Sequence, residues 1–145
     1  MTTRLDRLAP GRVLAGSMIL TFVALRAWLH VMPDTDLNVG PYNIHHLFTG
    51  VLILTVCGIP AVLNGTAGPG GRLLLAGFGV GLSMVLDEWV YLIVTGGSNA
   101  EYVGMPSLAG GAVLVGLASL YALRASPARD KMEPVHAPGP RRSTP

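Results

Sequence analysis

The sequence predicts an all-α membrane protein, a bundle of four transmembrane helices. Half of the 145 residues are hydrophobic and only 12% are charged, about half of the charge that a soluble domain carries. A soluble fold of this size could not cover its surface with so few polar side chains. The chain also contains four separate runs of mostly apolar residues, each roughly 20 residues long, which is what a helix needs to cross a bilayer.

The four predicted helices cover about residues 13–32, 42–63, 73–95 and 107–123. The first run ends at Pro33, the second at Asn64 and the third at Gly96, all residues that interrupt helices. Pro41 and Pro106 stand where the second and fourth helices begin, and proline in a first turn costs no backbone hydrogen bond. The first run is too long for a signal peptide, contains Arg26 and lacks a small-residue cleavage site, so we expect it to be retained.

Basic and acidic residues flank opposite ends of these helices. The basic ones lie before the first helix, between the second and third, and after the fourth: Arg4, Arg7, Arg12, Arg72, Arg124, Arg129, Lys131, Arg141 and Arg142. The other two loops carry Asp34, Asp36 and Glu101. By the positive-inside rule, both termini are predicted to be cytoplasmic and the protein to lie in the plasma membrane. The basic pI of about 9.0 thus reflects topology, and we expect no nucleic-acid partner.

The chain divides into a membrane domain, residues 1–124, and a tail, residues 125–145. The tail contains five prolines and mixed charge with little to bury, so it is predicted to be disordered in the cytoplasm. Cys57 is the only cysteine; it excludes disulfide frameworks within the chain and chemistry that needs a cysteine pair. We interpret it as a small core residue.

Three strongly charged residues fall inside the predicted helices: Arg26, Asp87 and Glu88. Each costs about 2.5–3.5 kcal/mol at the centre of a membrane helix, and less near its ends, so their presence requires an explanation. Three histidines occur in the same half of the bundle: His30, His45 and His46. The other half is predicted to be nearly pure hydrocarbon.

Helical geometry indicates which of these groups can meet. At 100° per residue, Glu88 falls on a stripe with Gly77 and Gly81, where another helix can approach closely. Arg26 and His30 share one face of the first helix. We therefore expect one cavity, open to the outside, around Arg26, His30, His45 or His46, Asp87 and Glu88, with Tyr91 and Thr49 in its lining. Trp28 and Trp89 point to lipid, and Tyr42 and Tyr102 are interpreted as interface anchors without chemistry.

The expected chemistry centres on the two carboxylates. Arg26 is the predicted counter-charge of one of them, which leaves the other beside a like charge, where it favours a bound proton or cation. Asp87, Glu88 and His46 are therefore the candidate catalytic or proton-transferring residues. The alternative is a divalent metal ion on His30, His45, His46 and Glu88, although two adjacent helical histidines point about 100° apart and cannot both ligate one ion without distortion.

These observations favour a small multi-pass membrane protein whose cluster binds a proton, a metal cation or a lipid headgroup. A more specific version is a membrane enzyme that acts on a lipid at the outer leaflet. One alternative is a structural or assembly subunit in which the cluster only orients helices, and another is a small transporter. Besides the bilayer, the expected partner is a second copy or another membrane subunit, bound through the glycine-rich faces of the third and fourth helices.

Overall fold

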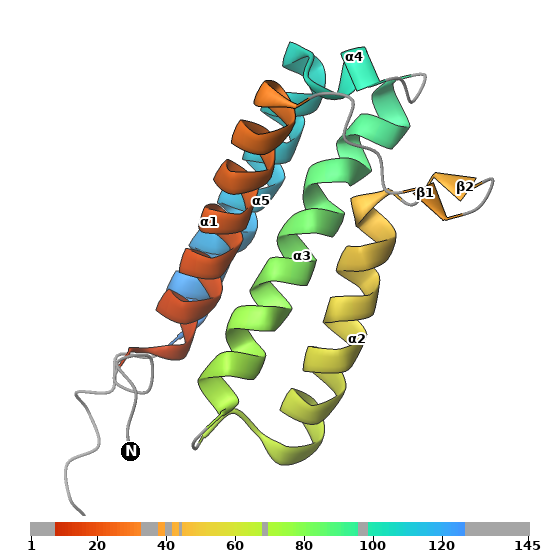
Figure 1. The fold of residues 1–145 in the computed structure, drawn as a ribbon. Coiled ribbons are helices and arrows are strands. Elements are labelled where there is room, and N and C mark those ends of the chain that lie inside the picture. Colours follow the sequence, from red (N-terminus) through yellow and green to blue (C-terminus); the bar gives the residue numbers. More distant parts are fainter. Residues whose placement is uncertain are drawn as a thin grey trace, which may run out of the picture.

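The computed structural model describes residues 8–32, 38–39, 42–43, 45–67, 70–95 and 99–126. The four long helices are α1 Pro10–Val31, α2 His46–Asn64, α3 Gly71–Val94 and α5 Met105–Ala125. All four are long and apolar enough to cross a membrane, so the predicted multi-pass helical bundle is confirmed (Figure 1). A single-turn helix, α4 Asn99–Tyr102, precedes α5.

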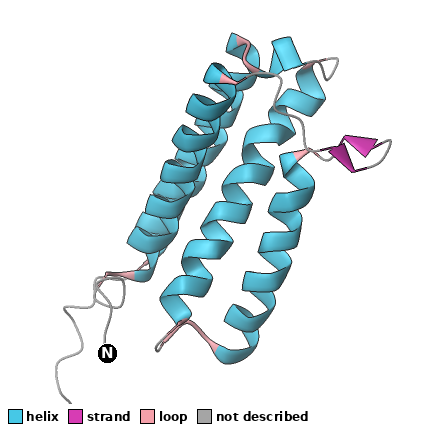
Figure 2. Cartoon of the chain, in the orientation of Figure 1, coloured by secondary structure: helices cyan, strands magenta, loops and turns pink. Residues whose placement is uncertain are grey.

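The start of α2 differs most from the predicted boundaries. Residues predicted as its first turn form β2 (Tyr42–Asn43), which pairs antiparallel with β1 (Asn38–Val39) (Figure 2). His45 then serves as the N-cap of α2, with an extended backbone at φ −59° and ψ 145°. The acidic loop with Asp34 and Asp36, and the predicted tail beyond residue 126, lie outside the described residues.

The helices form a three-helix unit with a fourth helix attached to one side. α1, α3 and α5 pack against one another, whereas α2 packs mainly on α3, on the side away from α1 and α5 (Figure 1). The centre of the three-helix unit is apolar and contains Met18, Val115 and Ala122. α2 approaches α3 closely where Gly50 meets Gly81: a Cβ added to Gly81 would lie 2.6 Å from the Gly50 carbonyl oxygen.

Most of the described glycines in α3 and α5 pack within the chain. Gly77, Gly79 and Gly81 of α3 lie against α2 or α1, and Gly110 of α5 lies against Val90 of α3. Of the glycines in α3 and α5 that the structure describes, Gly116 alone has open space at its Cβ position. The lipid-facing surface is formed by exposed apolar side chains, among them Leu20 (70%), Val62 (84%) and Tyr121 (75%), and by Trp28 and Trp89.

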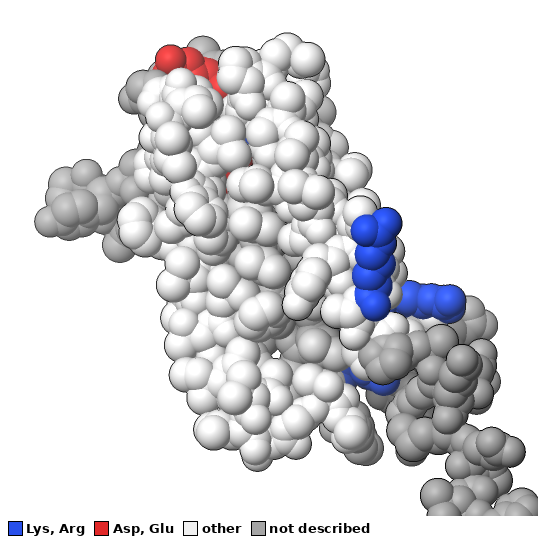
Figure 3. All heavy atoms as spheres, turned by 180° about the vertical axis from the view of Figure 1, so that it is seen from behind, with Lys and Arg blue, Asp and Glu red and all other residues white. Residues whose placement is uncertain are grey.

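The two ends of the bundle differ in charge. α1 begins and α5 ends at one end, where the Gly11 N–H donates to Ser126 Oγ over 3.1 Å; we call it the terminal end, and the opposite end the cluster end. Exposed Arg12 and Arg124 belong to the terminal end and exposed Glu101 to the cluster end. On the face drawn in Figure 3, basic and acidic side chains gather at opposite ends.

Candidate functional site

An ion pair between Arg26 of α1 and Asp87 of α3 forms the centre of the site. Nε and Nη2 of Arg26 both donate to Asp87 Oδ1, at 2.8 and 2.6 Å. The side chains are 9% and 0% exposed. Gly111 of α5 provides the necessary space, because a Cβ at this position would lie 2.6 Å from Asp87 Oδ1. The close passage of α5 therefore depends on the absence of a side chain there.

The remaining donors of Arg26 reach the segment that leads into α5. Nη1 donates to the Tyr102 carbonyl oxygen over 2.5 Å. Nη2 donates to both the carbonyl oxygen and Oγ of Ser107, at 3.2 and 3.0 Å. One guanidinium thus ties together α1, α3, α4 and α5, and its charge is satisfied by a carboxylate and by backbone oxygens.

Tyr102 covers the Arg26–Asp87 ion pair at the cluster end of the bundle. Its hydroxyl donates to Asp87 Oδ2, and its ring lies 4.1 Å from the guanidinium carbon of Arg26. The ring also makes edge-to-face contacts with His46 and Tyr91, with centroids 5.3 and 5.2 Å apart. Burial, together with the nearby charge of Asp87, raises the pKa of Tyr102, so its hydroxyl remains a donor at neutral pH.

The interpretation of Tyr102 as an interface anchor is therefore wrong. Tyr102 is only 6% exposed, because its position in α4 places the ring against Arg26, His46 and Tyr91. The side chain of Tyr42 lies outside the described residues. Sequence reasoning also missed Ser107 as a partner of Arg26; its place in the first turn of α5, one turn before Gly111, is the signal that could have identified it.

Glu88 points to the other side of α3, toward α2, since consecutive helical residues diverge by about 100°. Its Oε2 accepts the Leu47 backbone N–H over 2.6 Å, at the N-terminus of α2, where backbone N–H groups have no helical partner. The positive end of the helix dipole also favours a carboxylate there. Because α2 has no side-chain cap of its own, Glu88 takes that role from a neighbouring helix.

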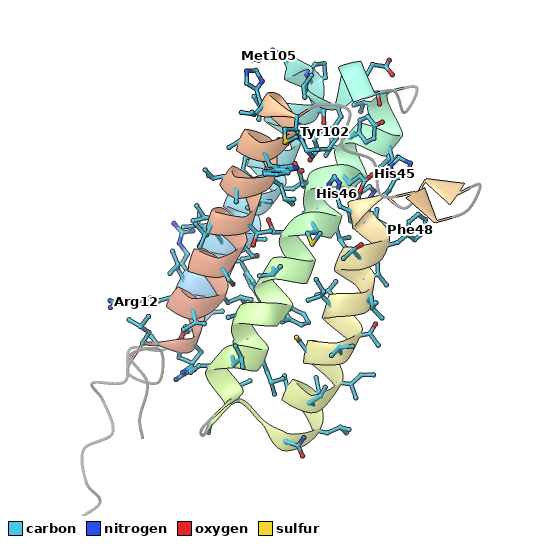
Figure 4. The ribbon with its side chains drawn as sticks, viewed as in Figure 1. Arg12, His45, His46, Phe48, Tyr102 and Met105 are labelled. Carbon is cyan, nitrogen blue, oxygen red and sulfur yellow. The ribbon has the colours of Figure 1, made fainter. Side chains whose placement is uncertain are left out.

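Both adjacent histidines approach Glu88. His45 Nδ1 lies 2.7 Å from Oε1, although no aligned hydrogen bond reaches this oxygen, and His46 Nδ1 lies 3.4 Å from Oε2. The expectation that two adjacent histidines cannot both ligate one ion assumes that both residues are helical. His45 is instead the extended N-cap residue of α2, so its ring and the ring of His46 both face the Glu88 carboxylate (Figure 4).

His46 bridges the two carboxylates. Its Nδ1 faces Glu88, and its Nε2 lies 3.6 Å from Asp87 Oδ2 and 3.3 Å from the Tyr102 hydroxyl. The His46 side chain is 19% exposed, and Glu88 is 1% exposed. One imidazole thus lies between two buried carboxylates.

The structure does not bring His30 into this group. Its side chain is exposed at the end of α1 and lines a depression of about 270 Å³ with Arg26, Ala27, Val103 and Leu108. Within the described part of the chain, no three His, Cys, Asp or Glu side chains are arranged to share a metal ion. The structure therefore does not bring the predicted metal ligands together around one position: His30, His45, His46 and Glu88.

The two predicted lining residues differ in position. Tyr91 is buried and packs against Tyr102, so it belongs to the wall of the site. Thr49 is half-buried in the first turns of α2. Among the described residues, the rings of Tyr102 and His46 lie against the carboxylates at the position of the expected cavity. We call the following group the polar cluster: Arg26, His45, His46, Asp87, Glu88 and Tyr102. Its most accessible member is His45, whose side chain is 34% exposed.

The polar cluster therefore contains two nearly unexposed carboxylates, one guanidinium and two imidazoles. This set can hold a proton and pass it between adjacent groups. Comparisons with protein-family models, with curated proteins and with solved structures found no match to this chain.

Proposed function

We propose that this chain is a small multi-pass membrane protein that binds and releases a proton at Glu88, His45 and His46. The observation that carries this proposal is the charge balance of the polar cluster. Asp87 and Glu88 are 0% and 1% exposed, and Arg26 supplies one positive charge for two negative ones. Burying an uncompensated charge is costly, so one further proton on this group makes the cluster neutral.

The cluster divides into a structural part and a titratable part. Asp87 receives bonds from Arg26 and Tyr102, neither of which gives up a proton near neutral pH. Glu88 instead faces two imidazoles, whose unperturbed charge change falls between about pH 5 and 8. The proton that is gained or lost is therefore assigned to Glu88 and its two histidines.

The partly exposed His45 provides a route for that proton. From His45 the proton reaches Glu88 Oε1 across 2.7 Å, and Glu88 Oε2 lies 3.4 Å from His46 Nδ1. Proton transfer needs a heavy-atom separation of about 2.6–3.2 Å or one bridging water. The first separation falls in this range, but the His45 ring must first align with Oε1, which has no hydrogen bond in the structure. The second step requires a small approach of the His46 ring.

The orientation of the chain sets the side from which protons arrive. The basic residues of the terminal end and the acidic residues of the cluster end follow the positive-inside pattern. We therefore place both termini in the cytoplasm and the polar cluster near the outer surface of the plasma membrane. A cysteine introduced at Glu101 should then react with an impermeant thiol reagent added outside intact cells; in the opposite orientation it would react only after lysis.

Proton uptake by the purified protein in lipid nanodiscs tests the proposal. The pH is lowered from about 8 to 5, the range in which histidines titrate, and bound protons are counted. Glu88→Gln should change the uptake in this range, because it removes the carboxylate that both imidazoles face. Glu101→Gln, a change of the same kind on an exposed residue, should match the wild type. An unchanged curve for Glu88→Gln would overturn the proposal.

The second candidate function is structural, and a separate observation favours it: Arg26 alone connects four helical elements. In a purely structural subunit, Glu88→Gln lowers stability and leaves proton uptake between about pH 5 and 8 unchanged. In a proton-binding protein both quantities change. Thermal unfolding and proton uptake of the same Glu88→Gln sample therefore separate the two. The enzymatic version finds less support, since a substrate reaches neither buried carboxylate unless Tyr102 or His45 moves.

A further inference from the structure

The terminal end carries a second unusual charge, the guanidinium of Arg72. This residue, in the first turn of α3, is only 5% exposed. Its Nη1 is buried and has no hydrogen-bond partner. A buried charged donor without an acceptor is unfavourable, and arginine at such a position normally faces an anion. The described residues contain three carboxylates, Asp87, Glu88 and Glu101, and all three lie at the cluster end.

Two helix N-termini meet at this end as well. α1 and α3 both begin here, neither has an acidic residue in its first turn, and no side chain of the N-cap residue caps either helix. In α1 the Gly11 N–H is bound to Ser126 Oγ, which leaves α3 as the helix whose start has no side-chain cap. Arg72 lies on the face of α3 that turns toward α1, since Gly79 and Ser83, two and three turns further along, contact α1 at Ser17 and Met18. The partial positive charge of both N-termini thus adds to that of Arg72.

Further positive charge surrounds this position. Arg12 in the first turn of α1 and Arg124 in the last turn of α5 are exposed, so both belong to the same end of the bundle as Arg72. The backbone of the α3 N-cap is also accessible: Gly70 has φ 92° and nothing within 4 Å of its Cβ position. Gly71 and Arg72, which follow it, are buried, with the Thr66 backbone against Gly71, so an anion approaches the start of α3 at Gly70.

From these features we infer a phosphate-binding site at the terminal end, with Arg72 and the N-terminus of α3 as its core. The guanidinium fork and free backbone N–H groups both match phosphate oxygens. The first turn of a membrane-spanning helix lies at headgroup depth, so the phosphate is assigned to an anionic phospholipid. Arg12 and Arg124 attract that lipid without enclosing it. This site is independent of the polar cluster and of its proposed proton.

Native mass spectrometry of the full-length protein tests the inference with two lipids, phosphatidylglycerol and phosphatidylcholine. The wild type should bind phosphatidylglycerol about fivefold more tightly or better, as expected from at least one well-placed arginine. Arg72→Gln should abolish this preference. Arg12→Gln, the matched change at an exposed arginine, should keep most of it. Should Arg72→Gln fail to fold, Arg72→Lys retains the charge without the fork and should lose part of the preference.

Inorganic phosphate distinguishes the two sources of the anion. If it displaces phosphatidylglycerol at millimolar concentration, the site takes free phosphate as well as lipid phosphate. If it does not, the site is specific for the lipid. The inference is overturned if the wild type shows no preference for phosphatidylglycerol, or if the preference survives unchanged in Arg72→Gln or Arg72→Lys.

Discussion

Replacing Arg26 with methionine should destabilise this protein more than any surface substitution. The change keeps most of the side-chain volume but removes both bonds to Asp87 Oδ1, at 2.8 and 2.6 Å, and the bonds to Tyr102 and Ser107. Asp87, which is 0% exposed, would retain only Tyr102 and His46 as partners. Removing one member of a buried ion pair costs about 3–5 kcal/mol, so we expect Arg26→Met to lower the free energy of unfolding by that amount.

Unfolding in mixed micelles, with increasing fractions of a denaturing detergent, provides the assay. Arg12→Met, the same change at an exposed arginine of the same helix, should stay within about 0.5 kcal/mol of the wild type. Adding Asp87→Asn to Arg26→Met should recover at least about 1 kcal/mol, since residues in contact show coupling of about 0.5–3 kcal/mol. A loss below about 1 kcal/mol for Arg26→Met, or strictly additive effects in the double variant, would show that the pair does not hold the helices together.

Other predictions concern Tyr102 and the glycine contacts. Tyr102→Phe should cost about 1.5–3 kcal/mol at neutral pH, the range for hydrogen bonds to charged groups, measured in the same unfolding assay. Because the pKa of Tyr102 is raised in the folded state, the wild type should lose stability as the pH rises above about 10, where the unfolded tyrosine ionises. Relative to Tyr102→Phe, this loss should reach up to about 1.4 kcal/mol per pH unit. Parallel curves of stability against pH for the two proteins would contradict this prediction. Gly81→Ala should cost about 1–3 kcal/mol through its clash with α2, whereas Gly116→Ala, which has open space, should cost nothing; equal effects of the two would contradict the close approach of α2 and α3.

The parts of the fold that depend on hydrophobic length could be predicted from the sequence. A membrane helix must be apolar over its whole span, so four spans and the unusual positions of Arg26, Asp87 and Glu88 stand out in the sequence. The depth of these residues follows from the rise of a helix. It places Arg26 and the carboxylates at similar levels, and the structure brings Arg26 and Asp87 into contact.

The details that depend on tertiary packing could not be predicted in this way. The sequence predicts too early a start for α2, because Pro41 suits a first helical turn. In the structure, residues 42–43 instead form a strand that pairs with β1. His30 shares a face with Arg26, yet only the longer arginine side chain reaches Asp87. Tyr102 belongs to the short helix α4, outside the predicted membrane helices, and no periodic pattern in the sequence predicts its contacts with Arg26 and Asp87.

The protonation of Glu88, His45 and His46 at neutral pH tests the proposed proton site most directly. Nitrogen-15 NMR of histidine-labelled protein in lipid bilayers distinguishes an imidazole that carries protons on both nitrogens from one that carries a single proton. Carbon-13 NMR reports in the same sample whether the Glu88 carboxyl is protonated. Since His45 and His46 both lie against Glu88, we predict that these three groups together hold one additional proton at pH 7, seen either as a doubly protonated imidazole or as a protonated Glu88. Two neutral imidazoles beside an ionised Glu88 at pH 7 would contradict the charge balance on which the proposed function rests.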